Sequence, residues 1–192
     1  MIGSGLPALV QESGRPRIVF AASLPVGTAG ERELLDLWLT EPRTAWQVRE
    51  ALVPVLPERH EIVGLENVWL GAPPLPGRVV GAEYVVRLAD PDGDGRSTLE
   101  AAAAELLAAD RLPRERAKGS GTKSYDLRPL LGDIAVEASG DEVRLRIRTV
   151  SQPDLGSGRP DEVLAALGDV AGGPLEVLSI VRARIRLADD RE

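Results

Sequence analysis

The chain has 192 residues, no cysteine and a formal net charge of −7 at pH 7. This length allows one large domain or two small ones. The lack of cysteine excludes a disulfide, a thiolate nucleophile and a zinc site or iron–sulfur cluster with Cys ligands in this chain. The charge argues against nonspecific nucleic-acid binding over the whole surface but permits a local basic face. The sequence has no membrane-span or signal-peptide pattern, so we expect a cytoplasmic protein.

In chain order, residues 1–76 predict two strands, a helix and a third strand. The spacing from Thr44 to Gln47 is that of a capping box and predicts where the helix begins. The sequence Ala72–Gly77 is rich in proline and reads as a linker. The predicted strands are Arg17–Leu24, Leu34–Thr40 and His60–Leu70.

Residues 77–192 predict the order β-α-β-β-α-β. The strands are expected at Ala82–Leu88, Ile134–Ala138, Val143–Val150 and Leu175–Leu187. A second capping box, Ser97 to Glu100, predicts the first helix of this half, and Pro160 suits the first position of the other. The order is ferredoxin-like. We therefore predict an α+β fold of tandem ferredoxin-like halves, 1–76 and 77–192, in which the first lacks its initial strand and helix.

A truncated first half leaves a sheet edge and a core face uncovered. Natural proteins cover or block such edges. Three occupants are open from the sequence: a second copy of the chain, which would make a homodimer through this half; a partner protein; and residues 1–11 folded back.

The run from Lys118 to Leu131 contains the only two lysines of the chain, Lys118 and Lys123, against 21 arginines. A lysine presents a compact ammonium where arginine presents a planar guanidinium. Glycine backbone in the same run permits close approach to a ligand. We therefore predict an anion-binding loop, in which Asp126 orients the others; the alternative is a surface loop without function. The predicted binding residues are Lys118, Gly119, Gly121, Thr122, Lys123, Asp126 and Arg128.

The same run carries a family resemblance. Residues 121–130, Gly-Thr-Lys-x-x-Asp-x-Arg-Pro-Leu, resemble the signature of a bacterial family of unknown function, the radical-SAM-linked domain. Further matches span nearly the whole chain: Gly5–Pro7, Phe20–Gly27, Leu35–Pro42 and Arg159–Leu164. The family's initial strand and helix, with Ser-His-Leu-Asp, would precede this chain, and its Gln-Gly-Phe-Asn-Pro run stands here as Glu12–Pro16, so no role of those residues is carried over.

The resemblance implies a partner. Members are fused to, or encoded beside, B12-binding radical SAM proteins. Because this chain has no cysteine for an iron–sulfur cluster, the resemblance implies a companion of that enzyme rather than the enzyme itself.

Two strands of the second half carry arginine at every other position. Period-two spacing places alternate residues on one face of a strand. If all share the face away from the helices, they form a seven-arginine surface suited to RNA phosphates. The alternative is that acids such as Glu33 and Asp36 neutralise them. The seven are Arg87, Arg144, Arg146, Arg148, Arg182, Arg184 and Arg186.

Three other features of the sequence give little support for a functional site. Residues 90–95 imitate the start of a calcium loop, but the twelfth position is Ala101, so an Asp/Gly turn is the better interpretation. His60 is the only histidine and lacks a motif that would make it a general base. The three tryptophans lie on separate predicted elements and favour packing or an interface. We predict no metal, cofactor or catalytic residue.

The sequence favours an accessory, non-catalytic protein of a radical SAM system that binds RNA, an anionic substrate or the partner enzyme. One alternative is a metal-independent RNA-processing enzyme that uses Lys123 or His60, an analogy of fold only. The other is a purely structural protein–protein adaptor whose arginines are held in internal salt bridges.

Overall fold

A computed structural model describes residues 4–90, 95–118, 121–139 and 142–190, with the backbone alone at 117, 118, 123, 138 and 139. The chain divides into two compact units, and each unit is built from two separate segments of the sequence. Unit 1 comprises Met1–Ala22 and Leu34–Arg78, and unit 2 comprises Ser23–Glu33 and Val79–Glu192. An α+β fold is confirmed, because the described residues form three α-helices, one six-stranded mixed sheet and two small sheets.

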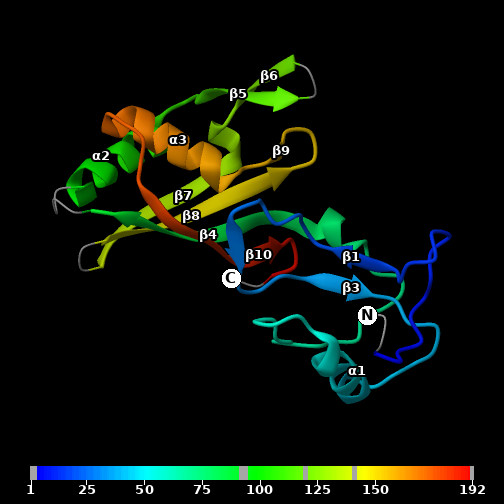
Figure 1. Ribbon diagram of the computed structural model, residues 1–192. Coiled ribbons are helices and arrows are strands. Elements are labelled where there is room, and N and C mark those ends of the chain that lie inside the picture. The colour runs from blue at the N-terminus through cyan, green and yellow to red at the C-terminus, as the bar shows by residue number, and fades with distance from the viewer. Residues whose placement is uncertain (1–3, 91–94, 119–120, 140–141, 191–192) are drawn as a thin grey trace. The chain divides into compact units, whose positions relative to one another are not determined.

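The large sheet belongs to unit 2. Its strands follow the order β2-β10-β4-β8-β7, with β9 beside β8 (Figure 1). All pairs are antiparallel except β2–β10, which is parallel. The strands are β2 (Thr28–Gly30), β4 (Val79–Ala89), β7 (Leu131–Ser139), β8 (Glu142–Gln152), β9 (Gly156–Ser157) and β10 (Val177–Leu187).

Helices α2 (Gly95–Ala108) and α3 (Pro160–Ala171) cover one face of this sheet (Figure 1). Their apolar stripes pack on alternate residues of β4 and β8, such as Val86 and Leu145, which are fully buried. We call the opposite sheet face the outer face. Helix α3 begins at Pro160 as predicted, since proline lacks only an N–H that the first helical turn leaves unbonded. Helix α2 begins two residues before Ser97, so the second capping box is wrong, and Asp90 Oδ1 instead accepts from the Gly95 N–H at 3.0 Å.

Unit 1 contains less regular structure than predicted. Strands β1 (Ile18–Phe20) and β3 (Leu35–Leu37) form a two-stranded ribbon, and α1 (Ala45–Leu52) has the Thr44–Gln47 capping box. The 3₁₀ turns Val53–Val55 and Leu75–Arg78 complete its elements. The predicted strand His60–Leu70 is wrong: these residues form no strand, because no neighbouring strand takes up their backbone groups. Tandem ferredoxin-like halves are therefore not shown.

The described residues of the N-terminal segment form backbone hydrogen bonds within unit 1. The Leu9 N–H donates to the Trp38 carbonyl and the Thr40 N–H to the Pro7 carbonyl, both at 2.8 Å.

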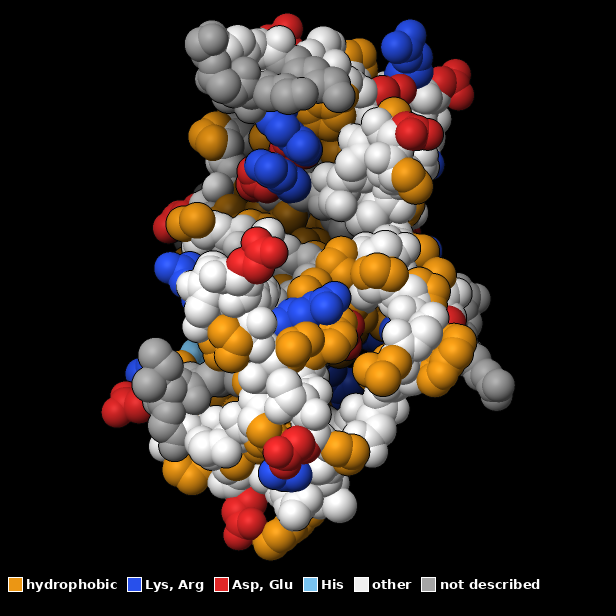
Figure 2. All heavy atoms as spheres, turned by 90° about the vertical axis from the view of Figure 1, so that its right-hand side faces the viewer, with side chains coloured by type: hydrophobic (Ala, Val, Ile, Leu, Met, Phe, Trp, Pro, Cys, Tyr) orange, Lys and Arg blue, Asp and Glu red, His pale blue; other side chains and the backbone are white. Residues whose placement is uncertain are grey.

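Large hydrophobic side chains remain exposed in the molecule (Figure 2). Those of unit 1 are Val10, Phe20, Leu35, Trp46, Val53, Val63, Val68, Trp69 and Leu70.

A buried ion pair fixes the segment Ser23–Glu33 to the sheet of unit 2. Arg182 on β10 is 2% exposed, and its Nε donates to Glu33 Oε1 at 2.8 Å while Nη1 donates to the Ser23 carbonyl at 2.9 Å. The buried Tyr84 hydroxyl adjoins the same guanidinium; burial raises the pKa of Tyr84, which stays protonated. A Cβ on Gly30 would lie 2.7 Å from Glu33, so glycine leaves the room that this carboxylate needs.

Among the described residues no helix has the length and the apolar run needed to span a bilayer.

The first prediction concerns this pair. Glu33→Ala should lower the free energy of unfolding by roughly 3–5 kcal/mol, because it leaves Arg182 buried without a counter-charge. Urea unfolding measures the loss, and the amides of β2 should exchange faster with deuterium. The control is Glu31→Ala, which removes an exposed carboxylate two residues away. Equal stability of the two variants would contradict the anchoring role.

Candidate anion-binding surfaces

The two lysines lie on a β-hairpin. Strand β5 (Pro113–Lys118) pairs antiparallel with β6 (Gly121–Asp126), so the run predicted as a loop is largely strand. Lys118 stands opposite Gly121 and Lys123 opposite Arg116 in the register. The predicted residue Gly119 lies outside the described residues. The hairpin brings Thr122, beside Lys123 on β6, to the same end as the two lysines.

Asp126 braces the base of this hairpin. Its Oδ1 accepts from the Leu112 N–H at 2.8 Å and from the Arg128 N–H at 3.0 Å, and Oδ2 lies 3.6 Å from Arg111 Nε. The hydrogen bond from Leu112, followed by that from Arg128 and the charge of Arg111, holds the pKa of Asp126 below its ordinary value. Asp126 thus fixes the backbone rather than the lysines at the far end.

Arg128 is a structural residue. Its Nε, Nη1 and Nη2 donate to the carbonyls of Ala109, Leu131 and Leu107 at 2.9–3.2 Å. Two of these carbonyls lie at the C-terminal end of α2, where backbone acceptors lack helical partners and a cation is favourable. Because all three nitrogens bind the protein's own backbone, we remove Arg128 from the set of anion-binding residues.

The base of the hairpin is joined to α3 by two ion pairs. Arg114 Nη1 lies 2.5 Å from Asp169 Oδ2, and Arg116 makes a bidentate pair with Glu162 at 2.6 and 2.7 Å. The Arg116 guanidinium also stacks on the Tyr125 ring, 4.9 Å from its centroid. Burial, with the adjacent Glu162, raises the pKa of Tyr125 to about 12, so its hydroxyl remains protonated.

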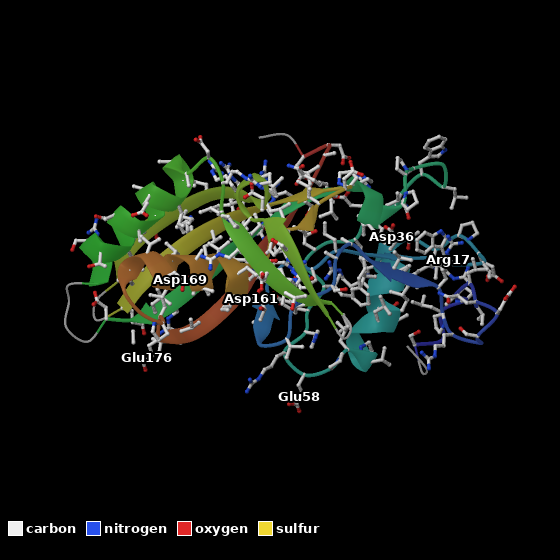
Figure 3. The ribbon with its side chains drawn as sticks, turned by 90° about the horizontal axis from the view of Figure 1, so that it is seen from above. Arg17, Asp36, Glu58, Asp161, Asp169 and Glu176 are labelled. Atoms are coloured by element: carbon white, nitrogen blue, oxygen red, sulfur yellow. The ribbon has the colours of Figure 1, made fainter. Side chains whose placement is uncertain are left out.

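Sequence reasoning missed Tyr125, Glu162 and Asp169. A signal was present for the two acids: they stand seven residues apart on α3, about two helical turns, and therefore on one face. Arg114 and Arg116 stand two apart on β5 and likewise share a face. That this face of β5 contacts this face of α3 follows only from the tertiary structure. Figure 3 labels Asp169 on α3.

The outer face of the sheet collects arginines from three adjacent strands. In the register, Arg87 lies opposite Arg144, and Glu83 lies opposite both Arg148 and Arg184. The predicted residues that share this face are Arg87, Arg144, Arg146, Arg148, Arg184 and Arg186.

Arg182 is the exception, because the prediction that it lies on the outer face is wrong. The pairing of β10 with β4 shifts between Arg182 and Arg184, so that Arg182 lies opposite Tyr84 on the helix-covered side while Arg184 lies opposite Glu83. A β-bulge of this kind inserts one residue and reverses the alternation of faces. The predicted neutralisation by Glu33 is confirmed for this one arginine.

Carboxylates neutralise part of the outer face. Arg87 makes a bidentate pair with Glu142, which lowers the pKa of that carboxyl. The other pairs are Arg146–Glu137, Arg184–Asp190 and Arg186–Glu83, at 3.0, 3.2 and 3.9 Å. Among the described residues, no ion pair involves Arg144 or Arg148. These two arginines of β8 are therefore the cations best placed to accept an external anion.

The hairpin and the outer face are separate candidate sites. The hairpin contacts α3, on the helix-covered side of the sheet (Figure 1). The arginines of β8 lie on the opposite side. One small ligand cannot contact both surfaces.

The structure gives little support for a functional role of the remaining candidate residues. His60 is exposed and its Nδ1 lies 3.0 Å from the Glu58 carbonyl. Trp38 stacks under Arg17 at 4.3 Å, which favours packing. Residues 91–94 of the calcium-like turn lie outside the described residues. Within the described part of the chain, no three His, Asp or Glu side chains gather as a metal site would require.

The second prediction concerns Asp126. Because its folded-state pKa lies below the unfolded value, the carboxylate stabilises the fold fully above about pH 4, and this contribution is lost as the pH falls through the folded-state pKa. Asp126→Asn keeps the acceptor oxygen but loses the charge, so it should cost about 1 kcal/mol at neutral pH. Urea unfolding across the pH range should show the difference shrinking below about pH 4. The exposed Asp110→Asn is the control, and a deficit that does not change with pH would contradict this assignment.

Comparison with known proteins finds a family model that matches the chain. No curated protein matches the chain. Residues 13–160 match the model of a family described as "Uncharacterized protein conserved in bacteria (DUF2344)". The match includes the whole hairpin and strands β4, β7 and β8. Because it covers more than half of the sequence, the chain belongs to this bacterial family, DUF2344.

Proposed function

We propose that the protein is an accessory, non-catalytic component of a radical SAM system and that it binds RNA through the outer face of unit 2. The link to radical SAM proteins rests on the resemblance of the Gly121–Leu130 signature and the stretches matched with it. The chain supplies no Cys ligands for a cluster, so the radical chemistry belongs to its partner.

The observation that carries RNA binding is the arginine row on β8. Arg144, Arg146 and Arg148 alternate along one strand, about 7 Å apart. Arg146 is 63% exposed, and its neighbours Arg144 and Arg148 make no ion pair with described residues. Such a row can follow the phosphates of a flexible single strand. The outer face offers no aromatic side chain on β4 or β8, so binding should depend on phosphates rather than on base stacking.

The ferredoxin-like interpretation is retained for unit 2. Apart from the inserted hairpin β5–β6 and the short strand β9, its element order is β4-α2-β7-β8-α3-β10, and its sheet has the antiparallel core β10-β4-β8-β7. Both features support a ferredoxin-like arrangement. For unit 1, the ribbon and the exposed apolar side chains support a truncated half that a partner enzyme or a second copy completes.

Two other functions stay open as alternatives. A metal-independent RNA-processing enzyme would need Lys123 or His60 as its base, and metal-free RNA cleavage lost in Lys123→Ala would support it. A structural adaptor is favoured by one observation, the internal pairing of Arg182 with Glu33.

The third prediction tests the outer face. Arg144→Ala/Arg148→Ala should weaken binding to a single-stranded oligouridylate at least tenfold at low salt. It should also reduce the log–log salt slope by about 1.4, that is about 0.7 per lost phosphate contact. Fluorescence anisotropy across a salt series measures both quantities.

Two matched variants decide the outcome. Arg96→Ala/Arg159→Ala removes the same charge from exposed sites at α2 and before α3, and should bind as the wild type does. Lys118→Ala/Lys123→Ala tests the hairpin. If only the lysine variant loses binding, the hairpin is the RNA site and the assignment to the outer face is wrong. If the wild type does not bind RNA, the adaptor becomes the better model.

A further inference from the structure

The hairpin face that packs on α3 has more hydrogen-bond donors than its surroundings satisfy. Arg114 Nε is buried and has no hydrogen-bond partner within the described structure, and the buried Tyr125 hydroxyl interacts with Glu162 and Arg116. Arg114 and Tyr125 stand opposite each other in the β5–β6 register, so their side chains are neighbours on one face. A buried donor without an acceptor is costly. The contact with α3 is therefore incomplete as it stands.

The same face already holds two carboxylates. Glu162 binds Arg116 through both oxygens, the fork geometry in which arginine also binds phosphate. Asp169 reaches only Nη1 of Arg114, which leaves the Nε side of that guanidinium unused. Asp169 is 66% exposed and stands in the last turn of α3, where the helix dipole disfavours a negative charge.

We propose that this face is a phosphate-binding site, in which Arg114, Arg116 and Tyr125 bind a phosphate group that displaces the carboxylates of Asp169 and Glu162. The carboxylates occupy the site in the absence of ligand and keep its arginines paired. A phosphate brings more acceptor oxygens than the single oxygen that Asp169 directs at Arg114, and it can accept from Nε and from the tyrosine hydroxyl as well.

Charge around the site favours this exchange. Lys118 and Lys123 stand on the same two strands, Lys123 directly opposite Arg116 in the register. The hairpin strands therefore carry four cationic residues, of which Arg114 and Arg116 pair with the two carboxylates of α3. The Tyr125 hydroxyl serves as a donor throughout the neutral range, since its pKa is raised to about 12. The site is independent of the outer face, which lies on the other side of the sheet.

The test measures binding of inorganic phosphate, uridine monophosphate and an oligouridylate to the full chain by calorimetry. Asp169→Asn removes the competing charge at an exposed position and should bind phosphate at least about fivefold more tightly than the wild type. Glu162→Gln should act in the same direction, and Arg116→Ala should abolish binding. The control Glu142→Gln removes the equivalent bidentate partner of Arg87 on the outer face and should change nothing.

Three outcomes would overturn the proposal. Unchanged phosphate affinity in Asp169→Asn and Glu162→Gln would make the carboxylates purely structural. Absence of phosphate binding in all variants would leave a buried water as the occupant. Loss of phosphate binding in Arg144→Ala/Arg148→Ala would move the site to the outer face. Tighter binding of the oligouridylate than of the mononucleotide, retained in that last variant, identifies RNA as the source of the phosphate.

Discussion

The one-sided burial of the large sheet is the constraint on which the rest of unit 2 depends. Two helices cover one face, and Val86, Leu145 and Ile147 are at most 1% exposed there. Because side chains alternate along a strand, every second residue of β4 and β8 is forced onto the opposite face. The arginine row of β8 is therefore the complement of the core in the same strand. An amphipathic strand of this kind fixes its own register, since a slip of one residue would bury three arginines.

The sequence could predict this strand because its pattern is strictly periodic. It could not predict the face of Arg182, because the bulge before Arg184 breaks the period without leaving a glycine or proline to mark it. The consequence is large. One displaced arginine becomes the buried partner of Glu33, a residue 149 positions away, and joins the segment Ser23–Glu33 to the edge of the sheet. Pairings across such a distance are set by the tertiary fold rather than by local propensity.

The signature on the hairpin shows a different limit. Its Asp126 and Arg128 were predicted to serve a ligand, yet they satisfy the backbone around the end of α2 and the start of β7. Charged residues in a signature can thus mark a fold requirement, which sequence alone does not distinguish from a binding role. Likewise, residues 60–70 have the composition of a strand but no partner strand, and propensity without pairing does not make a sheet. The Thr44 capping box was predictable because all its contacts are local.

In the function proposed above, the outer face of unit 2 binds RNA through the arginine row of β8, in which Arg144 and Arg148 make no ion pair with described residues. The most direct measurement is the side-chain Nε–H NMR spectrum of the ¹⁵N-arginine-labelled protein during titration with a single-stranded oligouridylate at low salt. RNA binding at this face should shift the signals of Arg144, Arg146 and Arg148, and added salt should reverse these shifts, while the signal of the buried Arg182 should not change. Shifts confined to other arginines, or a spectrum that RNA leaves unaltered, would contradict it.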